Sequence, residues 1–406
     1  MKNFYLVLFA VLFIGLSCAE NRKDNSITID NKSEVDTSVI FPGAYSTSKY
    51  IPLLKNKNVA LVVNQSSLIN ETHLLDTLTA LGITVKKIFS PEHGFRGKED
   101  AGKTIDNTID KATGVSVVSL YGKKRKPTKE DLKDIDIIIF DIQDVGVRFY
   151  TYISTMGLVM EAAAQNDIPF IVLDRPNPVG YLIDGPMLEE KYKSFVGMYP
   201  IPIAYGMTIG ELAKMIKGEK WIENAEDLDL TVVPCVNYRH DKIYNLPVKP
   251  SPNLPDLIAV TLYPSLCLFE GTTVSVGRGT DKPFKQIGHP GLKDYFKYYF
   301  VPEPTEGAKN PKHNGEKCYG IDLSGLKVKD IRFKNKLDLS YLVEFYKKLK
   351  NKDNYFLKNN WIDKLAGTDQ LKKMIIAGKT EDEIRASWKK DLDVFKGKRE
   401  KYLIYK

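Results

Sequence analysis

Residues 135–152 read IDIIIFDIQDVGVRFYTY, and this stretch decides the fold. Its first part, 135–141, is a short apolar run rich in isoleucine, which is typical of a buried β-strand. Several hydrogen-bonding side chains follow, and a helical pattern then covers 150–166. A strand, a polar turn and a helix in this order predict one unit of a parallel sheet covered by helices.

Short apolar runs alternate with helical patterns over the rest of the first half as well. Further strands are predicted at 59–63, 85–89, 115–120 and 170–173, and further helices at 73–81, 128–133 and 210–217. Two acids, Asp131 and Glu211, each lie three residues after a threonine, which is the spacing of an N-terminal capping box. These two acids are therefore predicted to cap helices rather than to catalyse a reaction.

A proline-rich segment, PVKPSPNLP at 247–255, predicts a boundary or a rigid crossing segment. Beyond it we expect a β-rich stretch at 257–276 and helices at 339–349, 361–376 and 381–402. A chain of 406 residues with 43% hydrophobic content is long enough for two domains. We predict an α/β domain over 41–252 and a smaller α+β domain over 253–406 that completes a cleft.

The N-terminus has the layout of a signal peptide: Lys2, an apolar run over 4–16, and then Cys18. The run is shorter than the roughly 20 residues that a membrane-spanning helix needs, although an uncleaved anchor is the alternative. The residues before Cys18 resemble a lipobox, with Gly15 where a branched aliphatic residue is usual. We predict a signal peptide over 1–17, a lipid on Cys18 that anchors the protein in the cell envelope, periplasmic or outer-membrane associated, and a flexible tether over 18–40.

Composition and motifs argue against several classes of function. The 59 basic and 51 acidic residues are scattered along the chain, so no basic stripe for nucleic acid is expected. Residues 97–104 match the phosphate-loop pattern, but this segment does not follow its strand directly and contains two acids, so no nucleotide cofactor is expected. The histidines lack paired spacing, and no metal is expected. Cys235, Cys267 and Cys318 are predicted to be buried thiols, with one disulfide as the alternative.

Polar side chains gather beyond the ends of three predicted strands, in FSPEHGFRG (89–97), FDIQDVGVRFYTY (140–152) and DRPNP (174–178). Open α/β sheets bind ligands at this edge, so these loops are predicted to face one crevice. The segment LFEGTTVSVGRGTDKPF (268–284) is too polar for a plain strand pair and is expected to cross toward them. The structural alternatives are an ion pair between Glu92 and Arg96, a strand that simply ends at Asp174, and a solvated hairpin at 268–284.

These motifs, together with VVNQ at 62–65, LYG at 120–122, and GMTIGEL at 206–212, closely resemble those of the NamZ-type exo-β-N-acetylmuramidases of glycoside hydrolase family 171. The resemblance runs from about residue 55 to the C-terminus. It implies a Rossmann-like N-terminal domain, a smaller C-terminal domain, and release of N-acetylmuramic acid from the non-reducing end of peptidoglycan-derived muropeptides or disaccharides. It also implies that Glu92 is catalytic. Tyr205 departs from the family, since many relatives have histidine there.

Glycosidic cleavage needs an acid for the leaving oxygen and a group that stabilises an oxocarbenium-like transition state. Glu92 is the predicted acid, and Asp144 and Asp141 rank above Asp174 and Glu270 as the second carboxylate; the alternative is attack by the substrate's own acetamido group. Substrate contacts are predicted for Asn64, His93, Arg96, Gln143, Arg148, Tyr150, Asp174, Arg175, Asn177, Glu270, Thr273 and Arg278.

The lactyl carboxylate distinguishes N-acetylmuramic acid from N-acetylglucosamine, and a guanidinium matches a carboxylate best. At least one arginine in the motif loops is predicted to contact it, namely Arg96, Arg148, Arg175 or Arg278. Two other functions are possible alternatives. The first is a non-catalytic muropeptide-binding lipoprotein. The second is an amidase or deacetylase, although the sequence contains no metal triad or nucleophile elbow to support it.

Overall fold

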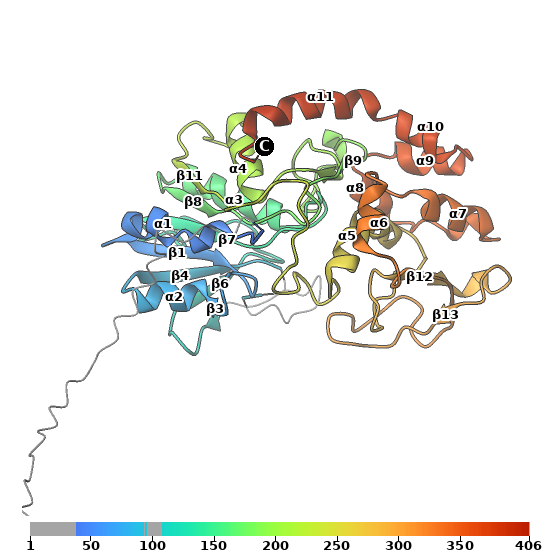
Figure 1. The fold of residues 1–406 in the computed structure, drawn as a ribbon, viewed down its shortest axis with the longest axis horizontal. Helices are drawn as coiled ribbons and strands as arrows, with labels where there is room; N and C mark the ends of the chain where they lie inside the picture. The colour runs from blue at the N-terminus through green and yellow to red at the C-terminus, as the bar shows by residue number, and fades with distance from the viewer. Residues whose placement is uncertain (1–37, 93, 96–107, 406) are drawn as a thin grey trace, which may run out of the picture. The chain divides into compact units, whose positions relative to one another are not determined.

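A mostly parallel sheet forms the first half of the computed structural model, which describes residues 38–92, 94–95 and 108–405 (Figure 1). Its strands are β1 (Asn58–Val63), β4 (Thr84–Ser90), β5 (Thr108–Ile109), β6 (Ser116–Ser119), β7 (Ile137–Asp141), β8 (Phe170–Leu173) and β11 (Leu230–Val233). They lie in the order β11-β8-β7-β1-β4-β6-β5, and only β5 pairs antiparallel. The five strands predicted from apolar runs are confirmed.

The topology of this sheet is that of a doubly wound fold. Numbered by their order along the chain, the parallel strands run 3-2-1-4-5-6 across the sheet, the arrangement of dinucleotide-binding domains. The order reverses between β1 and β7, so the loops that follow these two strands leave the sheet at its switch point. The predicted Rossmann-like α/β fold is confirmed.

Helices cover both faces of the sheet because successive side chains of a strand point to opposite sides. Ala60 and Val62 of β1 pack into one core with α3 (Tyr152–Ala164) and α4 (Ile209–Gly218). Leu61 and its alternate neighbours pack into a second core with α1 (Thr47–Leu54) and α2 (Leu74–Ala80). A sheet buried on both faces explains why its strands read as continuous apolar runs rather than as alternating patterns.

One predicted helix of the first half, at 128–133, is wrong. The segment forms a turn, although Thr128 N–H donates to Asp131 Oδ2 at 2.8 Å and Asp131 N–H donates to Thr128 Oγ1 at 3.2 Å, as in a capping box. Asp134 then adopts a φ of 59°, which ends the turn before a helix can propagate. The second predicted capping box, from Thr208 to Glu211, is confirmed at the start of α4.

The second half begins with a helix where β-structure was predicted. Residues 257–276 contain α5 (Leu257–Leu266) and the 3-10 helix η3 (Cys267–Gly271). Asp256 caps α5 by accepting a hydrogen bond from Ala259 N–H at 3.0 Å. Since α5 is buried from Ala259 onward, it has no polar face, and an apolar run of this length does not distinguish helix from strand.

The remainder of the second half is a small sheet with helices around it, which confirms the predicted α+β class. The sheet runs antiparallel in the order β12-β14-β13, with β12 (Gln286–His289), β13 (Tyr299–Phe300) and β14 (Cys318–Asp322). The helices are α6 (Val328–Phe333), α7 (Ser340–Lys348), α8 (Trp361–Ala366), α9 (Gln370–Ile376), α10 (Glu381–Ala386) and α11 (Lys389–Arg399). The helices predicted at 361–376 and 381–402 are therefore each divided in two. Within the described part of the chain, no helix is long and apolar enough to cross a membrane.

The end of the chain returns to the first sheet, where Figure 1 marks the C-terminus beside α4. Ile404 N–H donates to Glu211 Oε1 at 2.8 Å, and the Tyr405 hydroxyl donates to Asp174 Oδ2 at 2.6 Å. The last described residues are therefore hydrogen-bonded to two buried acids of the N-terminal half.

Arg148 connects the end of β7 to α8. Its guanidinium is fully buried and donates to the carbonyls of Pro186, Ile201, Leu365 and Ala366, the last at 2.6 Å. Gly367 follows α8 with a φ of 73°, and a β-carbon placed there would lie 2.5 Å from Arg148 Nη2. The turn between α8 and α9 thus requires a glycine for two separate reasons.

Gly367→Ala should lower the free energy of unfolding by about 3 kcal/mol, which combines left-handed strain with loss of a charged hydrogen bond. Gly378→Ala is the matched control, because its φ is 74° and nothing lies within 4 Å of the added carbon. The control should cost only about 1 kcal/mol. Urea unfolding followed by circular dichroism measures both changes. Equal losses would show that contact with Arg148 does not matter.

Candidate active site

A cavity of about 960 Å³ lies beyond the carboxyl ends of β4, β6 and β7. The first half of the chain contributes Glu92, Tyr121 and the segment 149–151 to its wall. The second half contributes Glu270 and Arg278, among others. As expected, the loop after β4, the start of α3 and the segment 268–284 meet around one hollow, but the predicted third strand-end loop, 174–178, does not line it.

Glu92 is half-buried on the cavity wall, directly after β4. The Thr151 hydroxyl, one residue before α3, donates a hydrogen bond to Glu92 Oε2 at 2.8 Å. Burial, and next the charge of Glu92, raises the pKa of Tyr121 well above its ordinary value. Burial likewise raises the pKa of Tyr152. The carboxyl group of Glu92 is therefore surrounded by neutral hydroxyl groups that can donate hydrogen bonds.

Glu270 is the other carboxylate on the wall among the residues that the structure describes. It forms a two-point ion pair with Arg278, with Nε–Oε1 at 2.6 Å and Nη2–Oε2 at 3.2 Å. Burial lowers the pKa of Arg278, but Glu270 and its neighbours outweigh this effect and raise it overall. This pair places one negative and one positive group at the cavity.

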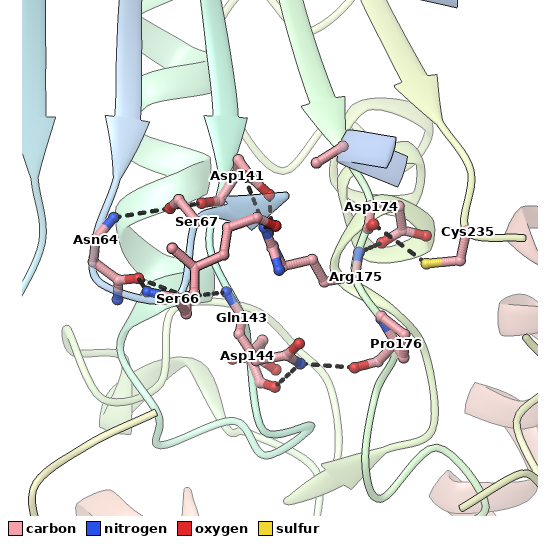
Figure 2. A network of polar contacts seen from close by, with 12 residues as sticks. Asn64, Ser66, Ser67, Asp141, Gln143, Asp144, Asp174, Arg175, Pro176 and Cys235 are labelled. Carbon is pink, nitrogen blue, oxygen red and sulfur yellow. Dashed lines mark hydrogen bonds and ion pairs between the residues drawn. The ribbon is translucent and has the colours of Figure 1, made fainter. Parts of the chain in front are cut away.

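Asp141 and Asp144 do not reach the cavity wall. Asp141 is fully buried in an ion pair with Arg175, with Nε–Oδ1 at 2.5 Å and Nη2–Oδ2 at 2.9 Å (Figure 2). Asp144 accepts hydrogen bonds from Gly146 N–H at 2.7 Å and from the Tyr205 hydroxyl, and burial raises its pKa to about 6. This placement argues against direct contact of either carboxylate with a substrate in the cavity.

At the switch point of the sheet, side chains of the neighbouring loops form hydrogen bonds with one another (Figure 2). Ser66 Oγ donates to Asn64 Oδ1 at 2.6 Å and accepts from Gln143 N–H at 3.0 Å. Gln143 Nε2 donates to the Pro176 carbonyl at 2.7 Å. Since doubly wound folds usually bind nucleotides here, this network explains why the fold carries a different kind of site.

Comparison with models of known protein families shows to which family this chain belongs. A family model described as the N-terminal part of the exo-β-N-acetylmuramidase NamZ matches residues 59–258, and the model of its C-terminal part matches 261–405. The chain belongs to the NamZ family.

Two kinds of relative agree with this assignment. A peptidoglycan β-N-acetylmuramidase NamZ of Bacillus subtilis (strain 168) is 40% identical over 100% of both chains. A crystal structure of a DUF1343 family protein from Bacteroides fragilis NCTC 9343 is 47% identical, with a TM-score of 0.84 over 91% of this chain and 99% of the other. A second DUF1343 structure from that bacterium is 30% identical, with a TM-score of 0.73 over 90% and 99%.

Several residues predicted to bind substrate form ion pairs or hydrogen bonds within this NamZ-family chain instead. Arg148 and Arg175 are buried; Arg148 donates to backbone carbonyls and Arg175 is paired with Asp141. Asp174 accepts from the Thr208 hydroxyl at 2.7 Å, and Asn177 Nδ2 donates to the Met207 carbonyl at 2.7 Å. Asn64 and Gln143 lie in the switch-point network, and Thr273 is not on the wall. Tyr205, the departure from the family, is fully buried.

Tyr150, Glu270 and Arg278 do reach the cavity, and the Tyr150 hydroxyl is directed to the Pro250 carbonyl at 2.8 Å. Cys18, His93 and Arg96 lie outside the described residues. The described cysteines are free and buried, as predicted, and the described residues contain no cluster of three metal-ligating side chains.

Sequence reasoning missed several wall residues. Tyr121 and Arg125 follow β6 and are therefore a fourth strand-end cluster; Tyr121 lies in the LYG motif, but neither residue was predicted to line the site. Lys312 had no signal at all. Its ammonium lies 2.6 Å from the Thr272 carbonyl and within 3.4 Å of three more carbonyls of 269–274, and burial lowers its pKa to about 8. Only the folded chain brings this loop to the cavity.

Arg175→Met should lower the free energy of unfolding by about 3–5 kcal/mol, because the Asp141 charge would stay buried without its partner. Lys350→Met is the control, since Lys350 and Asp294 form an exposed pair at 3.1 Å. The control should leave the urea midpoint unchanged. A midpoint for Arg175→Met that matches the control would contradict the importance of the buried pair.

Proposed function

We propose that this NamZ-family chain is an exo-acting glycoside hydrolase that releases N-acetylmuramic acid from the non-reducing end of peptidoglycan fragments. The full-length similarity to a peptidoglycan β-N-acetylmuramidase supports the substrate class. The observation that carries the proposal is the position of Glu92, on the wall of a cavity of about 960 Å³ and hydrogen-bonded to Thr151. A cavity of this size holds a sugar together with its substituents.

Glu92 acts as the general acid that protonates the glycosidic oxygen as the bond to the anomeric carbon breaks. Its hydrogen bond with Thr151 restricts the carboxyl group to one orientation toward the cavity. The phenols of Tyr121 and Tyr152, whose pKa values are raised by burial, contribute neutral polar groups around it. These groups hold the carboxyl group of Glu92 at the cavity wall, within reach of the leaving oxygen of a bound sugar.

Glu270 is the best-placed second carboxylate, because Asp141, Asp144 and Asp174 are engaged away from the wall. Its negative charge stabilises the positive charge that develops on the sugar ring, either directly or by orienting the substrate's acetamido group. The ion pair with Arg278 holds Glu270 in place for either role.

Glu92→Gln should reduce turnover of a chromogenic β-N-acetylmuramide by about 100-fold or more, because the variant lacks the acidic proton, and should leave binding largely intact. Glu130→Gln, an exposed position in the turn before β7, is the control and should keep wild-type turnover. Turnover comes from the released chromophore, and binding of N-acetylmuramic acid comes from calorimetry.

Two results would contradict this proposal in different ways. Undiminished turnover of Glu92→Gln would remove Glu92 from the mechanism. A wild-type protein that binds the sugar tightly but releases no chromophore would be a muropeptide-binding protein, or an enzyme that acts on another bond of the same polymer.

We also propose that the protein is exported and held at a membrane of the cell envelope by a lipid on Cys18. The support is in the sequence: Lys2, the apolar run over 4–16, and a small residue before the cysteine. The polar segment from 20 to about 39 then serves as a tether that lets the enzyme reach glycan fragments. A single acyl chain binds membranes only marginally, so stable anchoring requires more than one chain on this residue.

Cells that express the full chain and grow with an alkyne-labelled fatty acid provide the test. The wild-type protein and the control Cys318→Ser should carry the label and sediment with membranes. Cys18→Ala should lose both properties. Labelling of Cys18→Ala, or absence of label on the wild type, would rule out this anchor.

A further inference from the structure

Arg125 lies on the cavity wall, where its positive charge can bind a ligand. Its guanidinium lies 4.4 Å from the centroid of the Phe195 ring. The flanking Lys124 and Lys126 form ion pairs with Asp131 and Glu161 on other elements. In the part of the chain that the structure describes, no carboxylate forms an ion pair with Arg125. This side chain is exposed to the cavity and held by an aromatic face.

A continuous row of side chains links Arg125 to the proposed general acid. The rings of Phe195 and Tyr121 lie 6.0 Å apart, and Tyr121 is next to Glu92. Glu92 raises the pKa of Tyr121 and Arg125 lowers it, so both charges act on the same hydroxyl. All four side chains line the same cavity. A ligand whose reacting bond lies at Glu92 therefore presents its neighbouring substituents to Arg125.

The other cations of the wall are less suited to bind an anionic substituent. Arg278 is already paired with Glu270, and Lys312 is surrounded by backbone carbonyls. Lys309 and Lys364 are exposed on the wall, the latter with its ammonium 5.9 Å from the Trp361 ring, but an ammonium is a point charge. A planar guanidinium offers the two parallel donors that a carboxylate accepts best.

We propose that Arg125 binds the lactyl carboxylate of N-acetylmuramic acid and thereby selects muramic acid over glucosamine. This inference rests on the proposed function. Phe195 and Tyr121 provide apolar faces for the sugar ring and the lactyl methyl group, and the arginine supplies the charge. Arg125 acts as a specificity residue and not as a catalytic one, because the carboxylate it binds is remote from the bond that breaks.

A stem peptide is the other source of a carboxylate. When L-alanine is attached, the lactyl carboxyl becomes a neutral amide and the charge moves outward along the peptide. A groove of about 690 Å³ shares Arg125, Ser194 and Phe195 with the cavity, so such a peptide has a path to the same arginine. If Arg125 binds the lactyl carboxylate, it should increase kcat/KM for muramic acid without a peptide more than for muramic acid that carries one.

The test compares three chromogenic substrates: the β-N-acetylmuramide, its lactyl methylamide and the β-N-acetylglucosaminide. Arg125→Met should lower kcat/KM for the free acid by about 10- to 100-fold, the range expected for losing a charged hydrogen bond. It should leave kcat/KM for the other two substrates unchanged. Arg125→Lys should recover part of the preference, and Lys129→Met, an exposed position that lines neither the cavity nor the groove, should match the wild type.

Three results would overturn the assignment. Arg125→Met keeps the ratio of acid to methylamide, or Lys364→Met abolishes this ratio instead. The third is that Arg125→Met loses activity only on a fourth chromogenic substrate, the muramide with L-alanine on its lactyl group. Calorimetry with N-acetylmuramic acid and N-acetylglucosamine separates this inference from the proposed function. If the wild type releases no chromophore, the proposed hydrolase fails. The inference on Arg125 then still requires that the wild type bind muramic acid more tightly and that Arg125→Met remove this difference.

Discussion

The buried ion pair between Asp141 and Arg175 is the constraint on which the rest of the first half of the chain depends. It joins the ends of β7 and β8 beside the switch point, and Arg175 Nη2 also donates to the Leu68 carbonyl at 3.2 Å in the loop after β1. A buried charge is stable only with its partner, so the three loops keep one arrangement. This arrangement fills the place where doubly wound folds usually hold a nucleotide. The free cavity therefore lies to one side, at the ends of β4, β6 and β7.

The second half of the chain packs against these strand ends and completes the wall of the cavity. Arg148 donates hydrogen bonds to the carbonyls at the end of α8. Lys312 donates to carbonyls of the segment 269–274, which places Glu270 on the wall. The chain end then returns to Glu211 and Asp174. Two carboxylates that are 178 positions apart in sequence, at 92 and 270, thus face one hollow. Buried arginines that resembled ligand contacts in the sequence act here as the internal supports of the site.

The sequence predicted the sheet well, because its central strands are short runs rich in valine and isoleucine, as expected of strands buried on both faces. It failed where local patterns are ambiguous: α5 is buried on nearly all sides, and the capping pair at Thr128 closes a turn instead of a helix. It located Glu92 because polar residues at a strand end are exposed to the crevice. The same pattern misled at Asp141 and Arg175, since sequence does not reveal that two such side chains turn toward each other. Arg125 was not predicted, because the basic run 123–126 does not reveal which of its side chains turns toward the cavity.

A crystal structure of Glu92→Gln with a disaccharide that begins with N-acetylmuramic acid tests the central claim most directly. The sugar should occupy the cavity of about 960 Å³, with its glycosidic oxygen within hydrogen-bonding distance of the side chain at position 92 and with the Asp141–Arg175 pair intact. Sugar bound instead between the loops after β1 and β7, with that ion pair opened, would contradict the account.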